Sequence, residues 1–151
     1  MRHFFEDYLE RLEDLHRDLK QAISGLSVEA LDWLPGPEMN SLCVLIVHVT
    51  GAERYWIGEM VGEIPANRDR DSEFRARGLD EAALKQRLDD NLSLARRVLE
   101  KLTFDDLTTE RRSPLQDRAF SKGWALLHAL EHTALHTGHA QITRQMWDQR
   151  Q

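Results

Sequence analysis

The sequence predicts an all-α protein, a four-helix bundle with long connections between helices 2 and 3 and between helices 3 and 4. Four long segments place apolar residues at spacings of three and four, segments rich in polar residues separate them, and no segment shows a convincing strand pattern. The 151 residues suffice for one domain with its own core. We therefore expect residues 1–151 to form a single domain.

The first helix is expected over about residues 2–24, where one apolar stripe is flanked by acids and bases. Ser27 can cap a short helix that continues through Trp33. The sequence PGP at residues 35–37 then forces a turn, because two prolines and a glycine cannot continue a helix. The first stripe consists of Phe5, Leu9, Leu12, Leu19 and Ile23.

Each of the three further long helices follows a residue that can cap it. The second long helix is expected from Asn40 or Ser41 to about Val61. The third is capped by Asp80 and covers about residues 81–102, and the fourth is capped by Ser121 and ends near Trp147. The connections between them are expected to be irregular and are candidate flaps over one end of the bundle. The alternating charges of residues 68–77 indicate a solvated loop.

Composition excludes several classes of partner. The net charge of −6, with bases interleaved among acids, argues against nucleic-acid binding. No run approaches the roughly 18 apolar residues that span a bilayer, so no membrane partner is expected. The single cysteine, Cys43, cannot form an intramolecular disulfide, and the N-terminal residues lack a signal-peptide core. We therefore expect a cytoplasmic protein.

The segment WALLHALEHTALHTGHAQI, residues 124–142, holds four of the seven histidines: His128, His132, His136 and His139. At about 100° per residue, all four project from one side of a helix. The apolar neighbours predict that this helix is largely buried; they are Leu127, Leu130, Ala134, Leu135 and Ile142.

Buried imidazoles need partners, which are either hydrogen-bonding groups in the core or a metal ion. His128 and His136 are about 12 Å apart along the helix axis and cannot share one ion. The pairs 128/132, 132/136 and 136/139 all stay possible on spacing alone. A third nitrogen ligand is available in the second long helix, where His48 lies in an apolar run.

The stretches NSLCVLIVHVTGAERYWIGEMVG and WALLHALEHTALHTGHAQITRQMW resemble the two signature helices of the DinB-like superfamily of four-helix bundles. The resemblance extends over most of the chain. It implies a metal site made of one histidine from the second long helix and an HxxxH pair from the last. Carried over by position, these ligands are His48, His132 and His136.

One position departs from the pattern of that superfamily. Many members continue the last ligand with Arg-Gly-Gln, whereas here Thr137, Gly138 and His139 follow. His139 would supply an imidazole beside the ligands or toward a substrate, and it is the candidate catalytic residue for proton transfer. His128 is interpreted as a core histidine one turn from the site, with a substrate-facing role as the alternative.

Other polar residues receive structural interpretations. Cys43 and Glu53 are each five residues from His48 and off its helix face, so we expect Cys43 to be a small buried residue and Glu53 to make an interhelical contact. Tyr55 is expected in the core or lining a cavity. His16 is expected at the surface or in the partial core.

The resemblance implies a metal-dependent enzyme. Three imidazoles suit a divalent ion, zinc first, with nickel, iron or manganese as alternatives. The DinB-like superfamily includes S-transferases and isomerases that use a low-molecular-weight thiol, bacillithiol or mycothiol, and metal-assisted hydrolysis is a related possibility. A small-molecule substrate and a homodimer are expected. The alternatives are a non-catalytic metal-binding or ligand-binding stress-response module, and a bundle whose histidines only fill the core.

Overall fold

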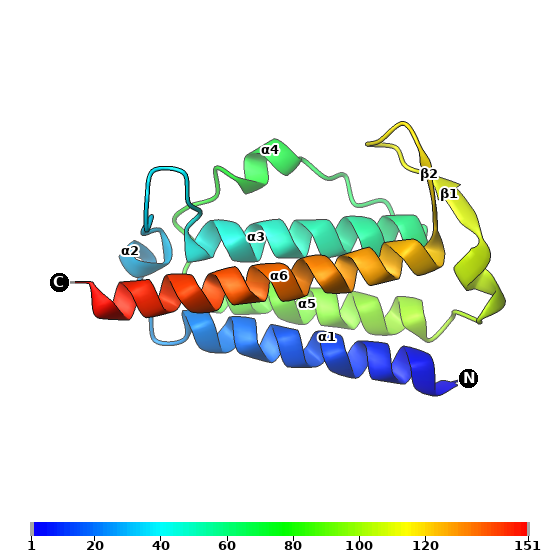
Figure 1. Ribbon diagram of the computed structural model, residues 1–151, viewed down its shortest axis with the longest axis horizontal. Coiled ribbons are helices and arrows are strands. Elements are labelled where there is room, and N and C mark those ends of the chain that lie inside the picture. Colours follow the sequence, from blue (N-terminus) through cyan, green and yellow to red (C-terminus); the bar gives the residue numbers. More distant parts are fainter. Residues whose placement is uncertain (1, 151) are drawn as a thin grey trace.

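A computed structural model describes residues 2–150 of the chain, and it confirms the all-α bundle (Figure 1). Four long helices form the bundle, and short elements lie in the connections between them. The long helices are α1 (Arg2–Ile23), α3 (Leu42–Glu53) with its continuation η1 (Arg54–Val61), α5 (Glu81–Leu99) and α6 (Lys122–Gln149). The short elements are α2 (Val28–Leu31), α4 (Arg70–Glu73), η2 (Asp105–Thr108), β1 (Glu110–Arg112) and β2 (Ala119–Ser121).

The long helices do not simply alternate in direction. Helices α3 and α5 run parallel, as do α1 and α6, and the two pairs are antiparallel to each other (Figure 1). The two helices of each pair contact each other, and between the pairs α1 contacts α5 and α3 contacts α6. The parallel course of α3 and α5 requires the connection of residues 62–80 to return along the length of the bundle. Because α4 lies in this connection, it packs against the outer side of α3.

The predicted caps are present at the start of the helices. The side-chain oxygens of Ser41, Asp80 and Ser121 accept hydrogen bonds from backbone N–H groups at the starts of α3, α5 and α6, and Ser27 does the same for α2. These caps satisfy donors that have no partner inside a helix. Of the two expected caps for α3, Ser41 is the one used.

Three expectations about the elements were incomplete. Residues 54–61 are helical as expected, but they form a π-helix, with Gly62 N–H bonding to Ile57 O. Residues 103–120 are not wholly irregular, because β1 and β2 pair as an antiparallel hairpin, in which Arg111 faces Phe120. Helix α5 ends at Leu99 rather than near residue 102.

The expectation that the last helix is largely buried was wrong for one of its faces. Leu127, Leu135 and Ile142 are 63%, 57% and 53% exposed. The opposite face of α6 is buried, and there small residues such as Ala129, Thr133 and Ala140 let the other helices approach. Among the described residues, no helix is both long and apolar enough to cross a bilayer.

Candidate metal centre

Three histidines meet in the half-buried space between α3 and α6. The ring centroid of His48 lies 4.8 Å from that of His132 and 4.9 Å from that of His136. The centroids of His132 and His136 are 4.4 Å apart. One nitrogen from each ring falls within 4.8 Å of the other two. Of the three pairs that spacing allowed on α6, the structure brings 132/136 together with His48.

The tautomer of His48 is fixed by a carboxylate. Its Nδ1 lies 3.1 Å from Glu73 Oε1, and because a carboxylate only accepts, Nδ1 carries the proton and donates. The remaining nitrogen, Nε2, therefore presents a lone pair toward His132 Nε2, 3.0 Å away. A hydrogen bond of this kind orients a metal-ligating imidazole and increases its basicity.

Arg68 holds Glu73 in place through two hydrogen bonds, from Nη2 to Oε1 at 2.8 Å and from Nε to Oε2 at 3.0 Å. Burial alone would raise the pKa of Glu73, but the hydrogen bonds from His48 and Arg68 lower the pKa below its ordinary value. The side chain is thus a carboxylate at neutral pH. Its approach to α3 requires Gly51, because a Cβ at that position would lie 2.0 Å from Glu73 Oε2.

The interpretation of residues 68–77 as a solvated loop was therefore wrong for the residues that support the site. The side chains of Arg68 and Glu73 are only 8% and 6% exposed. Phe74 covers His48, with the ring centroids 4.6 Å apart. Gly51, in the middle of an apolar helix and three residues after His48, is the one sequence signal that points to such a close approach.

The two ligand candidates on α6 are neutral at physiological pH. Burial, together with the neighbouring histidines, lowers the pKa of His132 to about 3. The same causes lower the pKa of His136 to about 4. Neutral imidazoles have a lone pair available, so three of them at these distances form a donor set suited to a divalent ion. The Nδ1 atom of His132 is buried without a hydrogen-bond partner among the described residues, whereas its Nε2 faces His48 Nε2 at 3.0 Å.

His139 and His128 lie on either side of this group along α6. His139 is exposed, and its Nδ1 lies 3.2 Å from His136 Nδ1. His128 stacks on Trp124, with centroids 4.8 Å apart and planes at 15°. Trp56 packs against His128 from η1 at 4.9 Å. His128 therefore belongs to an aromatic cluster one turn from the site, but its side chain is 32% exposed, so it lies at the edge of the core and not within it.

Beneath the site, a buried polar network joins all four long helices. Glu53 accepts hydrogen bonds from His16 Nε2 at 2.8 Å, Thr133 Oγ1 at 2.8 Å and Asn91 Nδ2 at 2.9 Å. His16 also faces the carbonyl oxygen of Leu88 at 3.2 Å through Nδ1. The expected interhelical role of Glu53 is confirmed. The expectation that His16 lies at the surface or in the partial core was wrong, because it is fully buried.

The other interpreted residues are buried as well. Cys43 is fully buried, as expected for a small core residue. Tyr55 is also buried, and its hydroxyl is hydrogen-bonded to Ser113. The Arg68 guanidinium lies over the Tyr55 ring, 5.9 Å from its centroid. Tyr55 therefore supports the site from within the core.

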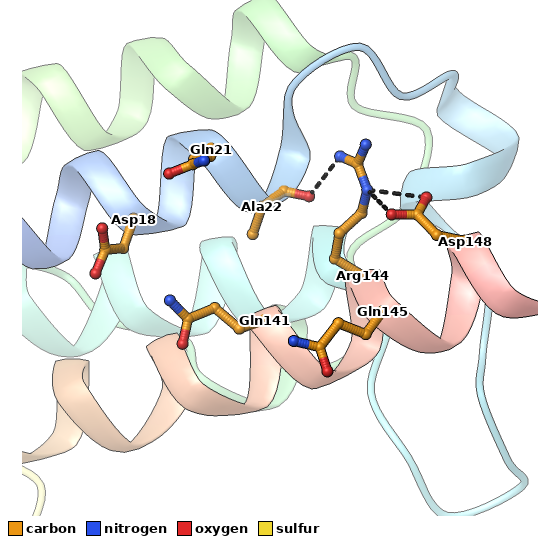
Figure 2. Close-up of a pocket in the computed structure, with 7 residues that line it drawn as sticks. All are labelled: Asp18, Gln21, Ala22, Gln141, Arg144, Gln145 and Asp148. Carbon is orange, nitrogen blue, oxygen red and sulfur yellow. Dashed lines mark hydrogen bonds and ion pairs between the residues drawn. The ribbon is translucent and has the colours of Figure 1, made fainter.

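A groove of about 500 Å³ between α1 and α6 does not include the histidine cluster (Figure 2). Arg144 dominates it, but its guanidinium already donates to Asp148 and to the carbonyl oxygens of Ala22 and Ser24. Arg144 thus satisfies carbonyl groups at the end of α1 and carries no free charge for a ligand. The remaining side chains drawn there are Asp18, Gln21, Gln141 and Gln145.

Two comparisons with known proteins find matches for this chain. The sequence model of the mycothiol-S-transferase family, a DinB-like family, matches residues 7–149. A crystal structure described as a conserved protein of locus from Enterococcus faecalis superposes with a TM-score of 0.79 at 15% identity. The match covers 96% of this chain and 97% of that one, and it shows a shared fold. Comparison with curated proteins gives no match.

Proposed function

The chain belongs to the mycothiol-S-transferase family, and we propose that it is a metal-dependent enzyme that joins a low-molecular-weight thiol to a small electrophilic substrate. The observation that carries this proposal is the group formed by His48, His132 and His136, whose nitrogens lie within 4.8 Å of one another. The family match supports the thiol, and the fixed tautomer of His48 supports a metal.

In this proposal the three histidines hold one zinc ion, with Glu73 orienting His48. A divalent ion supplies Lewis acidity that lowers the pKa of a bound thiol and leaves positions open beyond three protein ligands. In the same proposal His139 accepts the proton of the thiol, and its exposed position beside His136 supports this role. In the transfer, the sulfur–carbon bond forms as the bond to the leaving group breaks, and the leaving group departs with the bonding pair.

We further propose that the protein is cytoplasmic and dimeric, and that residues 1–151 act as one domain. The single cysteine supports a reducing compartment. The exposed Leu127 and Leu135 on α6 support a dimer, since a second copy would remove this apolar face from water.

The proposed activity can be tested with zinc-loaded protein, mycothiol and benzyl bromide, by following the thioether and bromide products. We expect turnover that depends on the thiol and that the His48→Ala variant loses. A matched His128→Ala variant should retain turnover, because His128 packs against Trp124 outside the triad. Thiol-independent consumption of an ester substrate would indicate metal-assisted hydrolysis instead. Inertness across thiols and electrophiles would favour a non-catalytic metal-binding module.

A further inference from the structure

A small apolar pocket lies beside His139, between the start of α3 and the C-terminal half of α6. Its volume is about 260 Å³. Met39 comes from the connection before α3, Leu45 from α3 itself, and Ile142 from α6. His139 forms part of its wall and is also 3.2 Å from His136, so the pocket adjoins the candidate metal centre.

Aromatic packing fills other sides of the centre. Phe74 lies against His48, 4.6 Å between centroids, on the side of α4. Toward the start of α6, His128 is stacked on Trp124 and packed by Trp56. The pocket lies in the opposite direction along α6, one to two turns beyond His136. A ligand that reaches the three histidines while burying an apolar group would therefore place that group beside His139.

The lining of the pocket determines the chemistry of its ligand. Met39 and Ile142 are 43% and 53% exposed, whereas Leu45 is buried, so together they offer an apolar surface with an open mouth. Glu38, Asn40 and Thr143 also line the pocket and add polar groups to its wall. An apolar cavity of about 150 Å³ already holds benzene, and drug-sized ligands need about 300 Å³ or more. A pocket of about 260 Å³ therefore suits one ring or a short alkyl chain.

We propose that this pocket binds the apolar group of the electrophilic co-substrate, and that it selects electrophiles carrying a single ring or a short alkyl chain over those carrying fused rings. This assignment rests on the proposed thiol transfer. Met39, Leu45 and Ile142 contact the apolar group, and the reactive carbon lies on the side of His136.

Binding can be measured separately from turnover with an unreactive probe, 4-fluorobenzyl alcohol. The probe is titrated into the ¹⁵N-labelled protein, with and without zinc, and amide shifts and ¹⁹F line widths are recorded. We expect shifts at residues 38–45 and 139–143, and an affinity at least about fivefold weaker in Ile142→Asn. Ile64→Asn is the matched control, because Ile64 is also exposed and lies outside this pocket.

Shifts confined to another region, such as the cavity near Phe5 and Phe104, would overturn the assignment, as would equal affinity in the two asparagine variants. A far-ultraviolet circular dichroism spectrum checks that both variants fold. If the probe binds here but thiol transfer is absent, the proposed function fails and the pocket stands. If thiol transfer occurs but the probe does not bind here, the pocket assignment alone fails.

Discussion

His48 depends on a residue that is distant in sequence, because Glu73 fixes its tautomer and Gly51 leaves the space in which that carboxylate lies. Replacing Gly51 by alanine would place a Cβ 2.0 Å from Glu73 Oε2 and push the carboxylate away. Loss of a partner that orients a ligand typically weakens metal affinity about 10–100-fold. We expect a loss of this size in Gly51→Ala and in Glu73→Ala, measured by zinc titration against a competing chelator.

Gly138→Ala provides the matched control for this prediction. Gly138 also lies within a long helix, but no atom approaches within 4 Å of a Cβ built there. This variant should keep the zinc affinity of the parent protein and gain stability, by about 0.5–1 kcal/mol, because alanine favours a helix over glycine. Equal zinc affinity in Gly51→Ala and Gly138→Ala would refute the role of Gly51.

Cys43 should be chemically inert in the folded protein. It is fully buried, and burial raises the pKa of its thiol to about 11. Because the thiolate is the reactive form, iodoacetamide should label Cys43 only as fast as the chain opens. Mass spectrometry of the labelling time course checks this, with urea-unfolded protein as the reference. Rapid labelling of the native protein, faster than its unfolding, would contradict the assignment.

How far single residues could be predicted depended on the kind of signal. His132 and His136 share a helix and a motif, so their spacing narrowed the possibilities and the DinB-like resemblance selected this pair with His48. Glu73 and Arg68 lie in a charged connection, where the sequence pattern is the same for a solvated loop and a buried ion pair. His16 was misplaced for a related reason, because its partner Glu53 is on another helix.

At the level of helices, the network around Glu53 fixes how α1, α3, α5 and α6 meet. Glu53 and His16 are almost completely buried, and Asn91 and Thr133 supply further donors. Leaving a buried hydrogen-bonding group without its partner typically costs about 1–3 kcal/mol, and more when the group is charged. We expect Glu53→Gln to lower the free energy of unfolding by this order at neutral pH, as measured by urea denaturation.

The same network predicts a pH dependence. Burial would raise the pKa of Glu53, but the charge of His16 and the hydrogen bonds from His16, Asn91 and Thr133 lower it below its ordinary 4.5. A group whose pKa is depressed in the folded state stabilises the fold at pH values above its unfolded-state pKa. This contribution is lost as the pH falls through the folded-state pKa. The stability difference between the parent protein and Glu53→Gln should therefore be largest at neutral pH and shrink below 4.5. A stability difference that stays constant across this pH range would contradict the prediction. The control is Glu10→Gln, at an exposed position, which should differ little in stability from the parent protein at any pH.

The extents of the long helices followed from their stripes and caps, because both signals are local. The direction of α5 relative to α3 could not be predicted from these signals, since a long connection permits either direction. The π-helical turns of η1 and the short hairpin also escaped prediction. A π-helix changes the backbone hydrogen bonds without an obvious sequence pattern, and strands of three residues are too short to show alternation.

At the scale of the whole molecule, the exposed apolar face of α6 predicts self-association. Leu127 and Leu135 lie two turns apart and are both more than half exposed. Sedimentation velocity should give twice the mass of the chain, and Leu127→Glu with Leu135→Glu should shift it to the mass of one chain, because a charge in an apolar interface is costly. Leu115 is 53% exposed on the β1–β2 connection, and Leu115→Glu should leave the mass unchanged. A single-chain mass for the parent protein would refute the dimer.

The measurement that tests the central claim most directly is the metal content of protein purified without a histidine tag, dialysed with zinc and analysed by mass spectrometry. The account predicts one zinc ion per chain in the parent protein and in His128→Ala. It predicts a near-complete loss in His136→Ala, because only two of the three imidazoles would then remain. A parent protein without zinc, or a His136→Ala variant with full zinc content, would contradict the proposed metal centre.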